Sequence, residues 1–133
     1  MQIIRVTDAP GSFKDRVIYL VLHELPNFTL YECKGKSELD LYASAETIVL
    51  DNLHQAISPS SIIAQVLSNA EGAKQVLLID QDQDHEFKLP EISVSRHIVI
   101  DLSERPCRRV VGRDYFRDGN SAAEAIFDLT RAA

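Results

Sequence analysis

The chain has 133 residues, of which 45% are hydrophobic and 26% charged, the proportions of an ordinary soluble globular protein. These values argue against a disordered or fibrous class, and the length suits one domain, residues 1–133, around a single core. A formal net charge of -6 argues against a general nucleic-acid binder, because affinity for the phosphate backbone depends on clustered Lys and Arg.

The two cysteines, Cys33 and Cys107, lie far apart without CxxC spacing, which predicts two buried thiols rather than a disulfide framework or a zinc site. The N-terminal stretch has no charged region followed by a long apolar run, and no segment approaches 18 apolar residues. We therefore expect a cytoplasmic protein in a reducing setting, without a membrane partner.

The first part of the chain predicts a strand, a helix and a strand. Residues 3–6, "IIRV", are typical of a short buried strand. Apolar residues recur at spacings of three and four over 12–25, which indicates an amphipathic helix, with Ser12 opening a capping box and Pro26 ending the helix. Residues 28–33, "FTLYEC", predict the second strand.

A polar stretch at 34–45, predicted to be a loop or a weak edge strand, precedes a third strand at 47–51. The run "TIVLD" lacks polar alternation, so it suits a central strand that is covered by helices on both faces. A second helix is predicted over 59–70, with Ser58 as its N-cap and Pro59 at its first position.

Two more buried strands are predicted at 75–80 and 96–102, separated by an acidic loop at 81–91. An arginine-rich connector over 103–119 then leads to a last helix over 121–133. Strands and helices thus alternate along the chain, which implies right-handed parallel crossovers.

The start of the last helix carries Ser121 and, three residues later, Glu124, a pair that resembles a capping box. The whole order of elements predicts a flavodoxin-like α/β fold. We expect a three-layer sandwich with about five mainly parallel strands.

Ligands of open parallel sheets bind beyond the carboxyl ends of the strands, near the point where the strand order reverses. The loops after the first, third and fourth strands should meet at that edge, where the N-termini of helices favour an anionic or hydroxyl-rich group. The predicted ligand-binding residues are Asp8, Ser12, Asp51, Asn52, His54, Ser58, Ser60 and Ser61.

These polar residues also have a structural alternative, because strand ends and helix starts need caps. Asp51 could either hold the adjacent loop or serve as a working acid. The four histidines show no metal-ligand spacing, and the chain has no GxGxxG, GxxxxGK[ST] or GxSxG motif. We therefore expect neither a metal nor a cofactor.

Two clusters of opposite charge remain. Residues 80–91 carry five acidic side chains against Lys88 alone, and residues 105–117 carry five arginines against Asp114 alone. The clusters could pair with each other, with a second copy of the chain or with a partner protein, or remain solvated. Anion binding by Arg108, Arg109 and Arg113 is a further alternative.

The segment from 45 to 102 resembles the core of the nucleoside 2-deoxyribosyltransferase and TIR-like group. Its pieces "TIVLD", "SPSS", "IIAQVLSNA", "GAKQVLLI" and "KLPEISVSRHIVIDL" match that group's strand ending in Asp, its turn, its helix, its Lys-containing turn and strand, and its Leu-Pro stretch with the last strand. The resemblance implies the same fold and a nucleotide-shaped pocket.

The catalytic Glu of that group falls on Ala64, with Gln65 beside it. Neither side chain can attack an anomeric carbon or stabilise an oxocarbenium ion by its charge. The resemblance therefore implies that N-glycosidase or deoxyribosyltransferase activity is absent.

The alternating order also resembles the response-regulator receiver, in which Asp51 would be the phosphoacceptor. Only Asp8 represents the acidic pair expected after the first strand, and the Lys expected after the fifth strand is missing from "VIDLS". We therefore do not expect phosphoryl transfer.

These patterns predict a small nucleoside- or nucleotide-binding, regulatory domain that is inactive as an enzyme. The alternative is a protein-interaction or oligomerisation module of receiver-like α/β fold, whose sheet edge or arginine connector contacts a partner. An enzyme would need a second carboxylate within reach of Asp51, and Asp8 is the only candidate.

Overall fold

The structure is a computed structural model that describes residues 1–8, 14–41, 45–69, 72–81, 89, 92–104 and 108–131. Its centre is a six-stranded sheet of order β2-β3-β4-β1-β5-β6, in which all neighbouring strands are parallel. The strands are β1 Gln2–Asp8, β2 Phe28–Glu32, β3 Thr47–Asp51, β4 Gln75–Gln81, β5 Arg96–Ile100 and β6 Asp114–Phe116. The predicted parallel α/β class is confirmed, with one strand more than expected.

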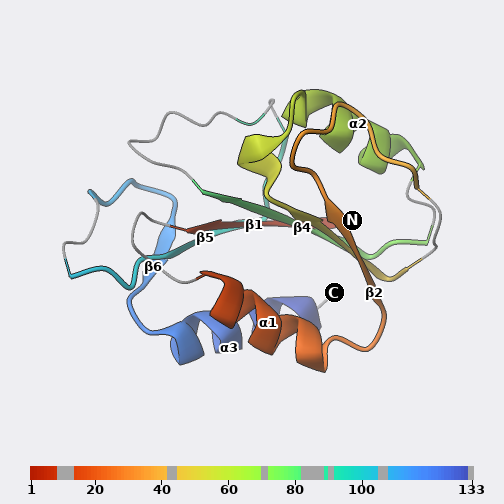
Figure 1. The fold of residues 1–133 in the computed structure, drawn as a ribbon. Coiled ribbons are helices and arrows are strands. Elements are labelled where there is room, and N and C mark those ends of the chain that lie inside the picture. Colours follow the sequence, from red (N-terminus) through yellow and green to blue (C-terminus); the bar gives the residue numbers. More distant parts are fainter. Residues whose placement is uncertain are drawn as a thin grey trace.

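Three α-helices cover the two faces of the sheet. Helices α1 (Lys14–Glu24) and α3 (Gly119–Arg131) lie together on one face, and α2 (Pro59–Asn69) lies on the other (Figure 1). A short 3-10 helix, η1 (Leu53–Gln55), precedes α2. The result is the three-layer sandwich of a flavodoxin-like domain. None of the described helices is long and apolar enough to cross a membrane.

The central strands are mainly apolar because both of their faces are buried. Along β1, Ile4 and Val6 pack against the layer of α1 and α3, whereas Ile3 packs against the layer of α2. On β4, Leu77 and Leu78 divide in the same way. The sequence runs without polar alternation therefore supply two cores, one on each side of the sheet.

The crossovers determine where the strand order reverses. After β1 the chain passes by way of α1 to the edge strand β2, and it then returns through β3 and β4. The connection that leaves β5 leads to β6 at the other edge, so it runs opposite to the connection that leaves its neighbour β1. The switch point of this sheet therefore lies between the carboxyl ends of β1 and β5, on the left in Figure 1.

Two sequence predictions are corrected. The arginine-rich connector contains β6, which pairs with β5 at Ile98–Ile100. Helix α3 begins at Gly119, before the predicted Ser121–Glu124 box, and its cap is Asp118. The Asp118 carboxylate accepts the Asn120 amide at 3.0 Å and the Ser121 hydroxyl at 3.2 Å. Because Asp118 lies one residue before the helix and binds an unpaired amide of its first turn, Ser121 is not needed as the cap and lies inside the helix.

Candidate functional site

Asp8 and Asp51 both end parallel strands, so they lie at the same edge of the sheet as predicted. Strand β4, however, lies between β1 and β3, and Asp51 is level with Ile79, two residues before Gln81, which pairs with Asp8. Two strand spacings and two residues of rise separate their Cα atoms by roughly 12 Å. The two carboxylates therefore do not form a close pair.

The ladder partner of Asp51 is Glu32, the last residue of β2, which the sequence analysis did not select. Glu32 and Asp51 are partners in the β2–β3 ladder, and residues in register on parallel strands point to the same face. The available signal was that the second predicted strand, residues 28–33, also carries an acid, Glu32, next to its carboxyl end.

Donors of the loop after β3 engage these carboxylates. Asp51 Oδ1 accepts the Asn52 amide at 2.9 Å, and the Asn52 side chain donates to both Glu32 oxygens at 3.0 and 3.1 Å. Asn52 has a left-handed backbone with φ of 53°, a conformation that Asn adopts more readily than most residues. His54 Nδ1 accepts the Gln81 amide at 3.0 Å, which ties the loop to β4. These contacts hold the loop in place.

The serines belong mainly to the start of α2. The helix begins at Pro59 as predicted, the Ser58 carbonyl accepts the Ile62 amide, and the Ser58 hydroxyl donates to that of Ser61 at 2.7 Å. Ser60 is exposed. Ser12 lies outside the described residues.

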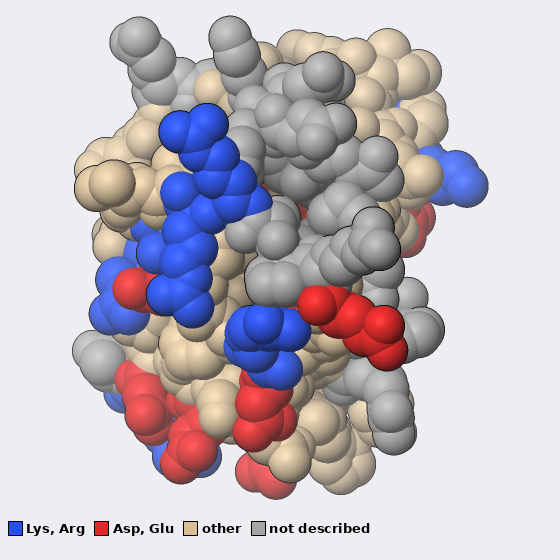
Figure 2. All heavy atoms as spheres, turned by 90° about the vertical axis from the view of Figure 1, so that its left-hand side faces the viewer, with Lys and Arg blue, Asp and Glu red and all other residues tan. Residues whose placement is uncertain are grey.

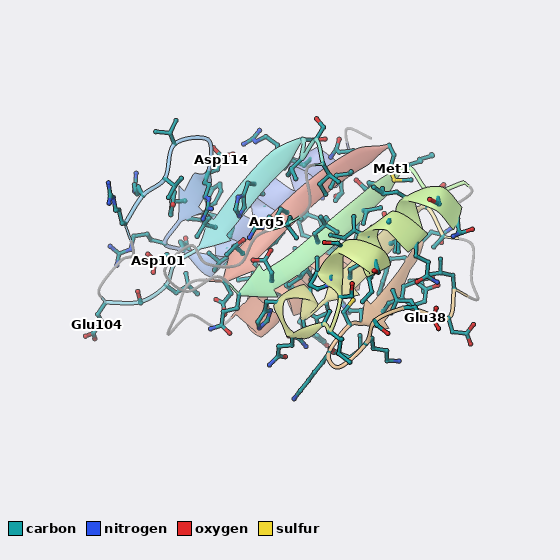
Figure 3. The ribbon with its side chains drawn as sticks, turned by 90° about the horizontal axis from the view of Figure 1, so that it is seen from above. Met1, Arg5, Glu38, Asp101, Glu104 and Asp114 are labelled. Atoms are coloured by element: carbon teal, nitrogen blue, oxygen red, sulfur yellow. The ribbon has the colours of Figure 1, made fainter. Side chains whose placement is uncertain are left out.

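A buried polar cluster crosses the centre of the sheet. Arg5 Nε donates to Asp80 Oδ2 at 2.6 Å and Arg5 NH2 donates to Asp80 Oδ1 at 3.3 Å. Arg5 is 8% exposed and Asp80 is fully buried. Figure 3 places Arg5 near the middle of the sheet. Asp80 therefore lies in the core on β4, as its place in the predicted strand 75–80 implies, and does not belong to the exposed acidic cluster in which it was counted.

The cluster continues to β5 through Thr7. Its hydroxyl donates to Asp80 Oδ1 at 2.9 Å and lies 2.6 Å from His97 Nε2. Because a hydroxyl has one proton, Thr7 must accept from His97, whose Nε2 then carries hydrogen. The sequence signal for this cluster was Arg5 inside the apolar run "IIRV", because a charged side chain in a buried strand requires a buried polar partner.

Two further carboxylates are buried on either side of the switch point. Asp8 is 5% exposed at the end of β1, and Asp101 is 1% exposed directly after β5. The amide of Asp101 donates to the Phe116 carbonyl, and its Oδ1 accepts the Ser103 hydroxyl at 2.6 Å. Asp101 was not among the predicted site residues, although it lies next to the carboxyl end of the predicted strand 96–102.

Cys33 is buried beneath the Glu32–Asp51 pair, and its thiol donates to the Tyr31 carbonyl at 3.7 Å. Burial raises the pKa of Cys33 from 9.0 to about 12, and the charges of Glu32 and Asp51 add to this effect. A thiol with such a pKa is not a nucleophile at neutral pH. Cys107 lies outside the described residues.

Among the described residues no group of three or more His, Cys, Asp or Glu side chains is arranged to hold a metal ion. A pocket of about 220 Å³ lies at the opposite, amino edge of the sheet, lined in part by Thr47, Gln75 and Phe127. None of the predicted site residues that the structure describes lines this pocket.

The position matched to the catalytic Glu of the deoxyribosyltransferase group is exposed. Ala64 lies on the outer side of α2. Its neighbour Gln65 binds the backbone of Leu39, accepting from the amide at 2.7 Å and donating to the carbonyl. Gln65 thus holds the β2–β3 connection against α2.

Fold and site together define a parallel α/β domain with buried acidic groups at the carboxyl edge of its sheet. Comparison with protein-family models, with curated proteins and with solved structures finds no significant match to this chain.

Proposed function

We propose that this protein is a small ligand-binding domain that takes a nucleoside- or nucleotide-type ligand at the carboxyl edge of the sheet and performs no chemistry on it. The observation that carries the proposal is the burial of Asp8 and Asp101 at the ends of β1 and β5. Buried acidic side chains cluster at sites that bind ligands, and the carboxyl edge of a parallel sheet is where such sites lie.

The chemistry of these groups suits a sugar with neighbouring hydroxyls. An ionised carboxylate only accepts hydrogen bonds, and a carboxylate at the carboxyl edge of a doubly wound sheet commonly accepts those of ribose. The polar cluster of Arg5, Thr7, Asp80 and His97 joins β4, β1 and β5 just behind this edge. A rigid support of this kind favours a pre-formed site.

The distances argue against glycosyl transfer by Asp8 and Asp51. A retaining enzyme needs two carboxyl groups about 5 Å apart, whereas the strand order separates the Cα atoms of these residues by roughly 12 Å. Glu32 and Asp51 are partners in the β2–β3 ladder, and both accept hydrogen bonds from Asn52 in the β3–α2 loop. We therefore assign this pair to loop positioning.

Binding can be tested by thermal unfolding and isothermal titration with adenosine, guanosine, their mono-, di- and triphosphates, and nicotinamide adenine dinucleotide. A ligand at a hundred times its dissociation constant should raise the free energy of unfolding by about 2.7 kcal/mol. Asp8→Asn and Asp101→Asn should each weaken binding about tenfold, because each loses a charge-assisted hydrogen bond. Absence of binding by every compound would refute the proposal.

The matched control is Asp128→Asn, the same chemical change at an exposed position of α3, which should leave affinity unchanged. Asp51→Asn tests whether the ligand binds at the β3 loop rather than at the switch point. A loss of affinity in this variant would indicate the β3 loop. Chromatography of the same samples would detect released base. If the unaltered protein releases base and Glu32→Gln does not, the protein is a glycosidase and the proposal is wrong.

An oligomerisation module is the second candidate, and the edge strand β2 favours it. Within the described residues β2 pairs only with β3, and Phe28 at its start is 37% exposed. An open strand edge can pair with another chain. Light scattering over a range of concentrations tests it, since a mass that stays at one chain would exclude this candidate.

A further inference from the structure

The segment 108–117, which leads into β6 and past its end, forms a positively charged surface beside the carboxyl edge. Its only acid, Asp114, is bound by Arg96, with Nε at 2.7 Å and NH2 at 2.6 Å from Oδ2. Its arginines are Arg108, Arg109, Arg113 and Arg117. In a chain of net charge -6 this is a local reversal of sign.

Tyr115 organises this segment. Its hydroxyl accepts the Val110 amide at 2.7 Å and donates to the Arg108 carbonyl at 3.4 Å. Its ring lies 5.6 Å from the guanidinium carbon of Arg109, a cation-π contact. Gly112, with φ of 88°, allows the chain to turn so that the Arg113 amide reaches the Val110 carbonyl. The backbone that carries the arginines is thus held before any ligand binds.

The turn surrounds an open hollow of about 420 Å³, lined by residues 109–116. Arg109 and Arg113 both line it, and Arg108 is exposed next to them. Figure 2 looks onto the carboxyl edge and shows Lys and Arg side chains gathered in a column along one side of it. Figure 3 shows the same loop extending between the labelled Asp114 and Asp101.

A hydrogen-bonded path joins this segment to the switch point. Arg117 NH2 donates to the Ser103 carbonyl at 2.8 Å, and the Ser103 hydroxyl donates to Asp101. The arginine surface and the buried carboxylate are therefore parts of one local framework. A ligand whose hydroxyls reach Asp101 could extend its other end toward the arginines.

We propose that Arg108, Arg109 and Arg113 form an anion site for the di- or triphosphate group of the ligand. This inference rests on the proposed function and narrows it to a nucleotide rather than a nucleoside. The guanidinium group matches phosphate with two parallel hydrogen bonds and stays charged at every physiological pH. Several such groups on a fixed turn suit a multiply charged phosphate chain better than a single carboxylate.

Isothermal titration of the intact protein with adenosine, adenosine triphosphate and inorganic tripolyphosphate tests the site. The triphosphate should bind about tenfold or more tightly than adenosine, with an affinity that falls as salt rises. The variant Arg108→Gln/Arg109→Gln changes two exposed residues, so the fold should persist. It should lose about tenfold in affinity for both phosphate compounds and none for adenosine.

Arg131→Gln is the matched control, because Arg131 is exposed at the far end of α3 and its loss changes the net charge without touching the turn. It should leave all three affinities unchanged. Equal affinity for adenosine and its triphosphate would overturn the anion site and leave the proposed function standing. Tripolyphosphate binding that the double variant abolishes, without adenosine binding, would support the anion site and refute the nucleoside site. Absence of binding by both phosphate compounds would overturn the inference.

Discussion

At the scale of single residues, Arg5 and Asp80 form a buried ion pair at the centre of the sheet. Its two charges are almost wholly removed from water, and Thr7 supplies Asp80 with one further hydrogen bond. Desolvating such a pair costs about as much as its attraction returns, so the pair contributes little net stability while it is intact. Removing one partner is a different case, because the other charge then remains buried alone.

Asp80→Asn should therefore lower the free energy of unfolding by about 3–5 kcal/mol, measured by urea denaturation at neutral pH. The double variant Arg5→Met/Asp80→Leu should recover most of that loss, because it buries no charge. Glu46→Gln is the matched control: its partner Lys74 lies 3.5 Å away on the surface, and the cost should stay below about 1 kcal/mol. An equal cost for Asp80→Asn and Glu46→Gln would contradict this account.

The burial of Cys33 makes the free energy of unfolding depend on pH. The pKa of Cys33 is raised from 9.0 to about 12, so the unfolded chain releases the thiol proton above pH 9 while the folded chain retains it. Stability from this group is thus fully present below pH 9 and is lost as pH rises toward 12. The free energy of unfolding should fall by about 1.4 kcal/mol per pH unit in that window.

Urea denaturation at several pH values between 8 and 11 measures this slope. Cys33→Ala should show a shallower decline, because it has no thiol to ionise, whatever its stability at neutral pH. Other alkaline titrations are shared by both proteins and cancel in the comparison. Identical slopes would mean that Cys33 ionises equally in the folded and unfolded chain.

At the scale of elements, apolar runs and turn residues predicted five strands and three helices close to their observed bounds. "TIVLD" is β3 at Thr47–Asp51, and Pro59 begins α2. These predictions depend on local physics, namely periodicity and capping, which a short window of sequence contains. The predicted start of α3 at Ser121 was wrong because the sequence offers two capping residues close together. Asp118, not Ser121, accepts the hydrogen bonds at the start of the helix.

Strand β6 could not be predicted from its own residues. Asp114–Phe116 has no apolar run, and its three residues are only half-buried. Its pairing with Ile98–Ile100 of β5 and the Arg96–Asp114 ion pair place it in the sheet. Such contacts between segments distant in sequence leave no periodic signal.

At the scale of the whole molecule, the sequence predicted that Asp8 and Asp51 share the carboxyl edge of the sheet but not the order of strands along it. Asp8 and Asp51 were expected to converge, and β4 separates them. Glu32 and Asp101 each lie near the carboxyl end of a predicted strand, but the sequence does not record that Glu32 pairs with Asp51 or that the Asp101 amide binds Phe116. Strand order is determined by how helices pack on the two faces, which composition and spacing do not record.

The same order predicts how the molecule opens. Strand β1 is paired on both sides, with β4 and β5, and its Arg5 binds Asp80 of β4, whereas among the described residues the short strand β6 pairs only with β5. Local opening requires breaking fewer buried contacts at the edge than at the centre. The amides of Ile4 and Val6 should therefore exchange only through global unfolding.

Native-state hydrogen exchange, followed by NMR at increasing urea concentration, measures this difference. The opening free energy at Val6 should equal the global free energy of unfolding and fall with the same urea dependence. The amides of β6 should exchange at least about tenfold faster and respond weakly to urea, since their opening exposes little surface. Equal protection of β1 and β6 would mean that the turn organised by Tyr115 is bound to the core as firmly as the central strand. In that case the arginine surface would open only when the whole sheet unfolds.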